Sequence, residues 1–287
     1  MTERDKAGLL HPGAALRRLA GSFQFLEGTV WHCRWGGLVF SDVPADKMYL
    51  WRPGEGVTIF RQPSRHANGN ALDRHGRLLT CEHGTRRVVR QEDDGTITVL
   101  ADSFLGRRLN SPNDVVVKRD GSIWFTDPPY GIAPEQREIP GNYLFRLGPE
   151  GGLEIAADDF IKPNGLCFSP GEGMLYVSDT ADERRHIRRF GVGKDNALSG
   201  GEVFAVISPG KSDGLRLDSE GRVWTTAGEG ILVLSPAGEI VARVPVPEAP
   251  ANCAFGGPGL STLYIAARTG LYAIDTLARG IDTGTPG

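Results

Sequence analysis

The sequence predicts an all-β fold, a six-bladed β-propeller with four-stranded blades, and three observations support this prediction. A unit made of a polar residue, a short strand, a tight turn and a second short strand recurs six times in the 287 residues. Successive units begin 41, 45, 51, 49 and 39 residues apart, close to the length of one propeller blade. The chain has 39 Gly and 19 Pro, and it lacks long amphipathic helical patterns, so many short strands joined by turns are expected.

Each unit begins with a side chain that carries an oxygen atom and continues through two strand-like runs. In chain order the units are 27–42, 68–82, 113–127, 164–179, 213–227 and 252–267. The runs "VVVK" and "SIWFTD" of the third unit are typical, because they are β-branched or aromatic and are bounded by turn formers. The turn glycine lies eight residues after the first residue in three units and nine residues after it in two. This constancy indicates one structural repeat.

The segments between the units supply the outer strands of the blades. The expected outer pairs are 86–91 with 97–102, 143–147 with 153–158, 186–192 with 201–207, and 231–235 with 240–246. After residue 267 the chain offers only "GLYAIDT" and a short tail, so the last blade lacks an outer strand. We expect the stretch 16–25 to pair with that blade and close the ring. The prediction is one domain over 16–287, preceded by a loosely ordered segment, 1–15.

Composition excludes several classes of function. The formal net charge of −3 provides no basic field for nucleic acid. No segment reads as a secretion signal or a membrane span, so a cytoplasmic protein is expected. The four cysteines lie far apart without a C-x-x-C pair, which favours reduced, buried thiols. The expected partner is a small molecule, and the sequence leaves monomer and dimer open.

The first residues of the units form a set with a common chemistry. In a propeller the first strand of each blade lines the central channel, so these residues should meet at one mouth. They are Glu27, Asn68, Asn113, Asn164, Asp213 and Asn252, two carboxylates and four amides without imidazole or thiolate. Such oxygens suit a hard cation, Ca²⁺ first, with Mg²⁺, Mn²⁺ or Zn²⁺ as alternatives. For any single position, an Asn or Asp that closes a turn is the competing explanation.

A second phase-matched set of acids ends the second strands. Its members are Asp42, Glu82, Asp127 and Asp179. The loops after these strands should rise beside the same mouth, so substrate contacts are expected from Glu82, His83 and Tyr130. For the three aspartates, turn capping is the preferred interpretation. Arg107 and Arg108 lie just upstream of Asn113, where they either reach a ligand or form a solvated pair.

The chain resembles the gluconolactonase and senescence marker protein (regucalcin) family. The resemblance covers nearly all of the sequence and is carried by "EGTVW", "RLNSPNDVVVKRDGSIWFTDPPYGI", "KPNGLCFSP", "SDGLRLDSEGRVW" and "NCAFGG". It implies a six-bladed β-propeller with a divalent cation in the central channel. It also implies hydrolysis of sugar lactones to aldonic acids.

The same resemblance assigns roles to individual residues. Glu27, Asn164 and Asp213 are expected to bind the cation directly. Asn113 either completes the coordination or holds water and substrate beside the ion, and Asp213 is the expected catalytic base. An arginine shortly before the Asn113 position touches substrate in some relatives, and Arg108 is the candidate here.

Three functions are therefore weighed. The first is cation-dependent lactone hydrolysis, in which Asp213 activates water. The second uses the same site on organophosphates or phosphotriesters. The third is a non-catalytic calcium-binding propeller. The match of "GKSDG" at 210–214 to a serine-hydrolase motif is attributed to chance, because a strand follows it where that motif needs a helix.

Overall fold

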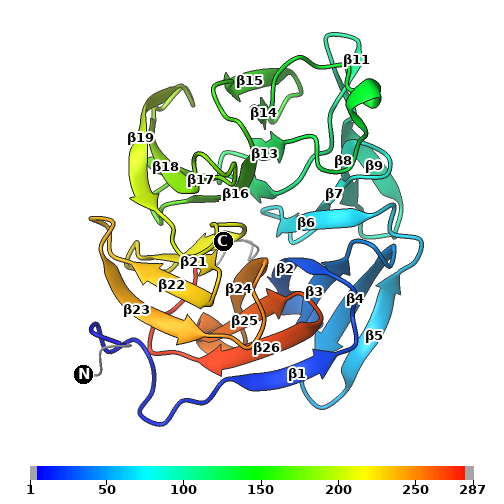
Figure 1. The fold of residues 1–287 in the computed structure, drawn as a ribbon. Coiled ribbons are helices and arrows are strands. Elements are labelled where there is room, and N and C mark those ends of the chain that lie inside the picture. Colours follow the sequence, from blue (N-terminus) through cyan, green and yellow to red (C-terminus); the bar gives the residue numbers. More distant parts are fainter. Residues whose placement is uncertain (1–4, 282–287) are drawn as a thin grey trace.

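The computed structural model describes residues 5–281, in which six four-stranded antiparallel sheets surround a central channel (Figure 1). In five of the sheets the strands follow one another in sequence order from the channel outward. The sheets stand side by side like blades, and the predicted six-bladed β-propeller is confirmed.

The first two blades each contain four strands in chain order. The first contains β2 (Leu26–His32), β3 (Gly37–Asp42), β4 (Lys47–Arg52) and β5 (Gly56–Arg61). The second contains β6 (Ala67–Leu72), β7 (Leu78–Glu82), β8 (Arg87–Gln91) and β9 (Ile97–Ala101). A two-stranded hairpin, β10 (Ser103–Phe104) with β11 (Arg107–Arg108), leads to the third blade.

The next three blades repeat the arrangement. The third contains β12 (Val115–Val117), β13 (Ile123–Asp127), β14 (Tyr143–Leu147) and β15 (Leu153–Ala157). The fourth contains β16 (Pro163–Phe168), β17 (Met174–Asp179), β18 (His186–Val192) and β19 (Leu198–Val206). The fifth contains β20 (Leu215–Leu217), β21 (Val223–Ala227), β22 (Gly230–Leu234) and β23 (Ile240–Pro245). The predicted outer strands are confirmed.

The last blade joins the two ends of the described chain. It contains β24 (Asn252–Gly256), β25 (Thr262–Ala267) and β26 (Gly270–Asp275), and its outer strand is β1 (Arg17–Gly21). β1 runs antiparallel to β26, with Arg17 opposite Ala273 and Gly21 opposite Gly270. The predicted closure by an N-terminal strand is confirmed, and it covers an edge that would otherwise be open.

The hydrophobic core is divided among the contacts between neighbouring blades. Each of six buried clusters draws most of its residues from two adjacent blades. Trp124 of the third blade meets Phe168 of the fourth edge-on at 5.6 Å between ring centroids, and Trp224 meets Phe255 in the same way at 5.2 Å. Because every blade is packed on both sides, the channel walls are fixed by large buried side chains.

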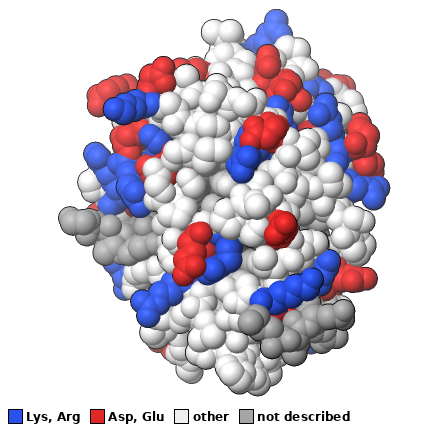
Figure 2. Space-filling model, turned by 90° about the vertical axis from the view of Figure 1, so that its left-hand side faces the viewer, with Lys and Arg blue, Asp and Glu red and all other residues white. Residues whose placement is uncertain are grey.

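Little of the described chain is helical. Three single-turn 3₁₀ segments occur, η1 (Cys33–Trp35), η2 (Pro134–Gln136) and η3 (Pro258–Leu260). Over residues 5–281, no helix is long and apolar enough to cross a membrane. Figure 2 shows basic and acidic side chains interspersed on one side of the molecule, between broad uncharged areas.

The structure describes the segment before β1 from Asp5 onward. Leu9 is buried in the cluster between the fifth and last blades, and the Asp5 carboxylate accepts hydrogen bonds from the amides of Leu9 and Leu10 at 2.9 Å. Residues 1–4 and 282–287 lie outside the described residues. A loosely ordered segment 1–15 and a domain spanning 16–287 therefore stay predictions.

Candidate active site at one mouth of the channel

The first residues of the six units converge at one mouth of the channel, although they are far apart in sequence. The side-chain amide of Asn68 donates a hydrogen bond to Asn113 Oδ1 at 2.7 Å. The side-chain amide of Asn113 in turn donates to Asn164 Oδ1 at 2.6 Å. On the other side, the Asn252 amide donates to Glu27 Oε2 at 3.1 Å. The Asp213 carboxylate interacts with both Asn164 and Glu27. The six side chains form a ring, which we call the oxygen ring.

Local backbone irregularities position these side chains. The strand register shifts between Glu27 and Val30 in the first blade and between Pro163 and Leu166 in the fourth. Such bulges re-aim a side chain without ending the strand. Glu27 and Asn164 both lie within these shifts.

The glycine after the first residue lets neighbouring blades approach closely. A Cβ atom on Gly28, which has φ 59°, would lie 1.9 Å from the Asn68 carbonyl oxygen. A Cβ atom on Gly165 would lie 2.2 Å from the Asp213 carbonyl oxygen. The pairs "EG" and "NG" therefore have a physical reason, because only glycine tolerates the neighbouring backbone there.

Two carboxylates in the oxygen ring repel each other. Burial, followed by the charges of Asp213 and Asp114, raises the pKa of Glu27 well above its usual range. Burial and the charge of Asp114 raise the pKa of Asp213 to about 7, and a hydrogen bond from Asn164 acts in the opposite direction. Ionised acids so close together need a positive partner.

The donor atoms of the oxygen ring fit a hard divalent cation. Glu27 and Asp213 supply carboxylate oxygens, and Asn113 and Asn164 supply amide oxygens. Within residues 5–281, no group of three or more His, Cys, Asp or Glu side chains is placed to hold a metal ion. A cation at this mouth would therefore have to use amide oxygens as well, which Ca²⁺ accepts readily.

The end of β7 and the residue that follows it carry two of the predicted contact residues. His83 is buried, with Nε2 3.0 Å from Asn68 Nδ2, and burial lowers its pKa to about 4. Glu82 accepts a hydrogen bond from Arg87 Nε at 2.7 Å and lies 3.6 Å from Arg61. His83 therefore adjoins the ring, whereas the Glu82 carboxylate is engaged by positive partners.

Two further predicted contact residues lie at the rim. Tyr130 is 42% exposed, and its hydroxyl is hydrogen-bonded to Thr180. Burial of its hydroxyl end, with a contribution from Asp213, raises the pKa of Tyr130 to about 12. Arg108 is exposed, and its guanidinium donates to the Thr85 carbonyl at 3.1 Å while its amide donates to Glu138.

The aspartates that end the second strands bind backbone amides. Asp42 accepts from Gln24 and Phe25 at 3.0 Å. Asp179 accepts from Ile161 and Lys162 at 2.9 Å, and Asp127 accepts from Asn110 at 2.7 Å. These amides lie 17 or 18 residues before each aspartate, so the carboxylates bind a distant segment, whereas the prediction was that they cap the turns that follow them. Within the described chain, only Asp179 also accepts from a local amide, that of Ala181 at 3.3 Å. Each one fixes the segment that leads into the first strand of its blade.

The serine of "GKSDG" has a structural partner. Ser212 is buried, and its hydroxyl lies 2.6 Å from the Thr225 hydroxyl. The strand β20 follows it, so the interpretation of this motif as a chance match is confirmed.

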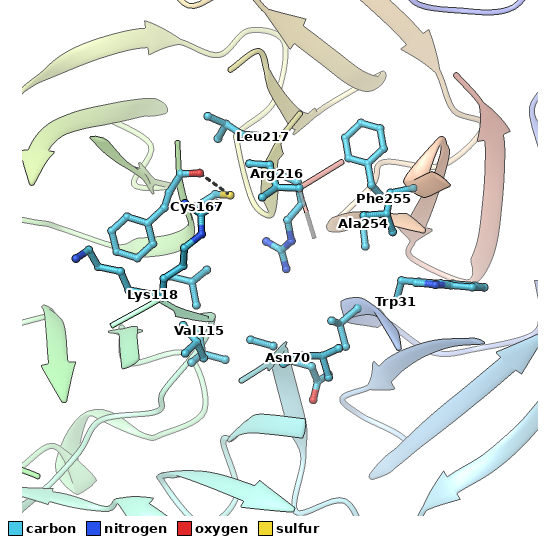
Figure 3. A pocket seen from close by; sticks show the side chains of 18 of the residues that line it. Trp31, Asn70, Val115, Lys118, Cys167, Arg216, Leu217, Ala254 and Phe255 are labelled. Atoms are coloured by element: carbon cyan, nitrogen blue, oxygen red, sulfur yellow. Dashed lines mark hydrogen bonds between the residues drawn. The ribbon is translucent and has the colours of Figure 1, made fainter. Parts of the chain in front are cut away.

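The rest of the channel has a different character. A cavity of about 590 Å³ lies toward the turn end of the inner strands, and all six blades line it. Figure 3 shows apolar side chains such as Val115, Leu217 and Phe255 around it, with the Arg216 guanidinium near its middle. The four candidate ligands are not among the described residues that line this cavity.

Sequence reasoning missed two charged residues of the channel. Asp114, which directly follows Asn113 in the chain, is buried, and it forms an ion pair with Arg216 at 3.5 Å. One signal could have revealed Asp114, because most other units have glycine at the corresponding position.

The fold and the oxygen ring define a class of protein, a closed six-bladed β-propeller with a candidate cation site at one mouth of its channel. Residues 25–269 match the protein family described as SMP-30/Gluconolactonase/LRE-like region. The chain belongs to this family.

Individual relatives are similar over most of their length. A gluconolactonase of Zymomonas mobilis subsp. mobilis is 31% identical, with 95% of this chain and 84% of the relative covered. A pentonolactonase of Haloferax volcanii is 29% identical, covering 85% of this chain and 81% of the relative. The solved structure of a gluconolactonase from Xanthomonas campestris is 35% identical with a TM-score of 0.90, covering 95% of this chain and 94% of that chain.

Proposed function

We propose that the protein is a lactonase that hydrolyses a sugar (aldono-)lactone to the aldonic acid with the help of one divalent cation, most suitably Ca²⁺. The observation that carries the proposal is the oxygen ring, in which the carboxylates of Glu27 and Asp213 and neighbouring side-chain amides come together at the channel mouth. Membership of the SMP-30/gluconolactonase family supports it, as do relatives named for lactone hydrolysis.

Four residues of this chain would hold the cation. Glu27, Asn164 and Asp213 would bind it directly, and Asn113 would complete the coordination or orient water and substrate. When bound, a divalent cation supplies Lewis acidity for the carbonyl oxygen of a lactone. The side-chain amide of Asn113 donates to Asn164 Oδ1 at 2.6 Å, so these two proposed ligands lie next to each other.

Asp213 is proposed to accept the proton of the attacking water. The hydroxyl of that water adds to the carbonyl carbon, the ring C–O bond breaks, and the proton finally resides on the released alkoxide oxygen. A positioned general base contributes about 10² to 10⁴-fold to such a step. Because lactones are activated esters, this contribution is sufficient for useful turnover.

The rim would orient the hydroxyl groups of the sugar. His83 is neutral at physiological pH because burial lowers its pKa to about 4, so its ring can accept or donate one hydrogen bond. Tyr130 offers a hydroxyl beside Thr180, and Arg108 offers a guanidinium at the exposed edge. A substrate contact from Glu82 stays a prediction, since Arg87 already binds that carboxylate.

The test is a substrate panel crossed with a cation panel. Hydrolysis of gluconolactone, xylonolactone and galactonolactone would be followed after complete removal of metal and after addition of Ca²⁺, Mg²⁺, Mn²⁺ or Zn²⁺. Rates should fall on removal and recover with at least one cation. Unchanged rates in the metal-free protein would contradict the role of the cation, and failure to hydrolyse any lactone would contradict the function itself.

The other two functions predict different outcomes in the same experiment. Hydrolysis of phosphotriesters in preference to lactones would favour the organophosphatase alternative, although the polar rim suits polyhydroxylated ligands better. Full lactonase activity in Asp213→Asn would leave Asp213 without the proposed role and revive the non-catalytic calcium-binding propeller. A cytoplasmic location and a monomeric or dimeric state stay predictions.

A further inference from the structure

Asp114 is exceptional in the repeat. In four of the six units the residue after the first one is glycine, namely Gly28, Gly69, Gly165 and Gly214. In the third unit this place is taken by Asp114, whose side chain is only 3% exposed. A carboxylate therefore lies inside the channel where most units have no side chain at all. Burial of a charge without a partner is costly, so this position calls for an explanation.

Arg216 is the partner of this carboxylate. Its Nη1 atom lies 3.5 Å from Asp114 Oδ2, and its side chain is 17% exposed. Nη1 also donates to the Leu215 carbonyl at 2.7 Å, which holds the guanidinium in place on β20. Figure 3 shows the Arg216 side chain directed from its strand into the channel.

The remaining contacts of Asp114 do not neutralise it. Oδ1 accepts a hydrogen bond from the Val115 amide at 3.0 Å. Oδ2 has no direct hydrogen bond within the described part of the chain, so the guanidinium of Arg216 is the positive group that it faces. Arg216 also lines the cavity, so the pair joins the residue next to Asn113 to the wall of that cavity.

The charge of Asp114 reaches the oxygen ring. Asp114 directly follows Asn113, whose side chain belongs to the oxygen ring, so its carboxylate lies close to the residues proposed to hold the cation. The nearest basic residue before Asp213 in the chain, Lys211, is ion-paired with Asp182 at 3.0 Å. Three carboxylates, one guanidinium and one divalent cation together carry no net charge.

We propose that the Asp114–Arg216 pair is a built-in charge balance that sets the affinity of the oxygen ring for its divalent cation. Arg216 offsets Asp114, so that the carboxylate does not draw the cation down the channel. Asp114 in turn shields the cation from the positive charge of Arg216. Both residues act through the ring as positioning residues, and this inference rests on the cation site of the proposed function.

The proposal predicts opposite effects for the two halves of the pair. Asp114→Asn leaves the guanidinium unpaired, so Ca²⁺ should bind at least about tenfold more weakly, as expected for one unit charge within about 10 Å at an effective dielectric constant of about 20. Arg216→Met leaves a carboxylate facing the bound cation, so Ca²⁺ should bind more tightly. The double variant Asp114→Asn/Arg216→Met should return to within about threefold of the wild-type Kd.

Isothermal titration of the full metal-free chain with CaCl₂ at pH 8 would measure these constants. The matched control is Asp73→Asn, which breaks the ion pair with Arg77 at 2.8 Å in the turn at the far end of the second blade. This control should leave the Kd unchanged. Equal Kd values for wild type and Asp114→Asn, or a double variant that binds as weakly as Asp114→Asn, would overturn the proposal.

A second measurement guards against misfolded variants. Thermal unfolding in chelator should show that each single substitution lowers Tm more than the double substitution does, since only the single variants leave a buried charge unpaired. Additive changes in Tm would overturn the pairing. Arg216→Lys, which keeps the charge, should bind Ca²⁺ within about threefold of wild type, and loss of binding in this variant would count against a purely electrostatic role.

The outcomes separate this inference from the proposed function. Ca²⁺ binding with the predicted pattern of Kd values but without lactone hydrolysis would contradict the proposed reaction and support the charge balance. Lactone hydrolysis that depends on Ca²⁺, with no response of the Kd to Asp114→Asn, would support the reaction and overturn the charge balance. Absence of cation binding by the wild-type chain would overturn both.

Discussion

The two ends of the central channel are built by the same six inner strands, yet their chemistry is opposite. At one mouth, the first residue of each unit contributes an oxygen, and hydrogen bonds link these side chains into a ring. A few residues further along the same strands, Val115, Leu217 and Phe255 line an apolar cavity. The difference teaches that the repeat places a side-chain oxygen at one position of every unit, whereas positions further along the strands vary and include both apolar residues and Arg216.

The Asp213→Asn substitution should have the largest effect of all, a loss of catalytic activity at the mouth that carries the oxygen ring. It removes the proposed base and one charged ligand, so kcat/KM for the preferred lactone should fall by about 10² to 10⁴-fold or more. Steady-state kinetics with saturating Ca²⁺ would measure this. A variant that keeps wild-type kcat/KM would contradict the role given to the mouth.

The Trp124→Ala substitution should affect the packing between blades and leave the chemistry intact. Trp124 is fully buried against Phe168, so its removal should lower the free energy of unfolding by about 3–5 kcal/mol. Ile59→Ala on the exposed face of β5 is the control and should stay within about 0.5 kcal/mol. Chemical denaturation would show the contrast, and equal effects of the two substitutions would refute the assignment of the core.

One pair of substitutions compares two aspartates at the same mouth. The Asp42 carboxylate accepts hydrogen bonds from two backbone amides, so Asp42→Asn should lower the free energy of unfolding by about 1–3 kcal/mol. Asp213 has a raised pKa, which means that its ionised form destabilises the fold above the pKa of the unfolded chain. Asp213→Asn should therefore leave the metal-free protein as stable as wild type or more stable.

Unfolding at pH 8 in chelator would measure both changes. Because the two substitutions are chemically identical, their comparison removes most effects of the unfolded state. A loss of stability of similar size in both variants would show that Asp213 is a turn cap and not a strained ligand.

The Arg17→Ala substitution should have the smallest effect. Arg17 bridges β1 to Asp275 at 2.5 Å, but both side chains are about half exposed. Exposed ion pairs contribute about 0–1 kcal/mol, so closure of the ring should depend on the β1–β26 backbone pairing and not on this contact. Thermal unfolding at low and high salt would test this, and a Tm loss larger than that of Asp42→Asn would contradict it.

The sequence predicted the fold because the same strand and turn signals recur in every unit. Each unit carries its own strand and turn signals, so six blades and the closure by 16–25 follow from local patterns. The first residues could be placed for the same reason, because their phase in the unit is constant. Local turn capping was predicted for Asp42 and Asp179 from the ordinary behaviour of aspartate, and Asp179 binds such a local amide, whereas Asp42 binds amides of a distant segment.

Other features of the site could not be predicted, because they depend on contacts between different blades, which the spacing of residues along the chain does not reveal. Glu82 was predicted from its phase to face substrate, and the contact that binds it from another blade is Arg61. The pairing of Asp114 with Arg216 likewise joins the third and fifth blades. Such contacts depend on how two blades face each other across the channel, which the order of residues along one blade does not reveal.

The most direct test is a crystal structure of the full chain grown with Mn²⁺, with anomalous scattering used to locate the metal. The account predicts one anomalous peak at the mouth, surrounded by the carboxylate oxygens of Glu27 and Asp213 and the amide oxygen of Asn164. A peak elsewhere, or side chains of these three residues directed away from a common ion, would contradict it.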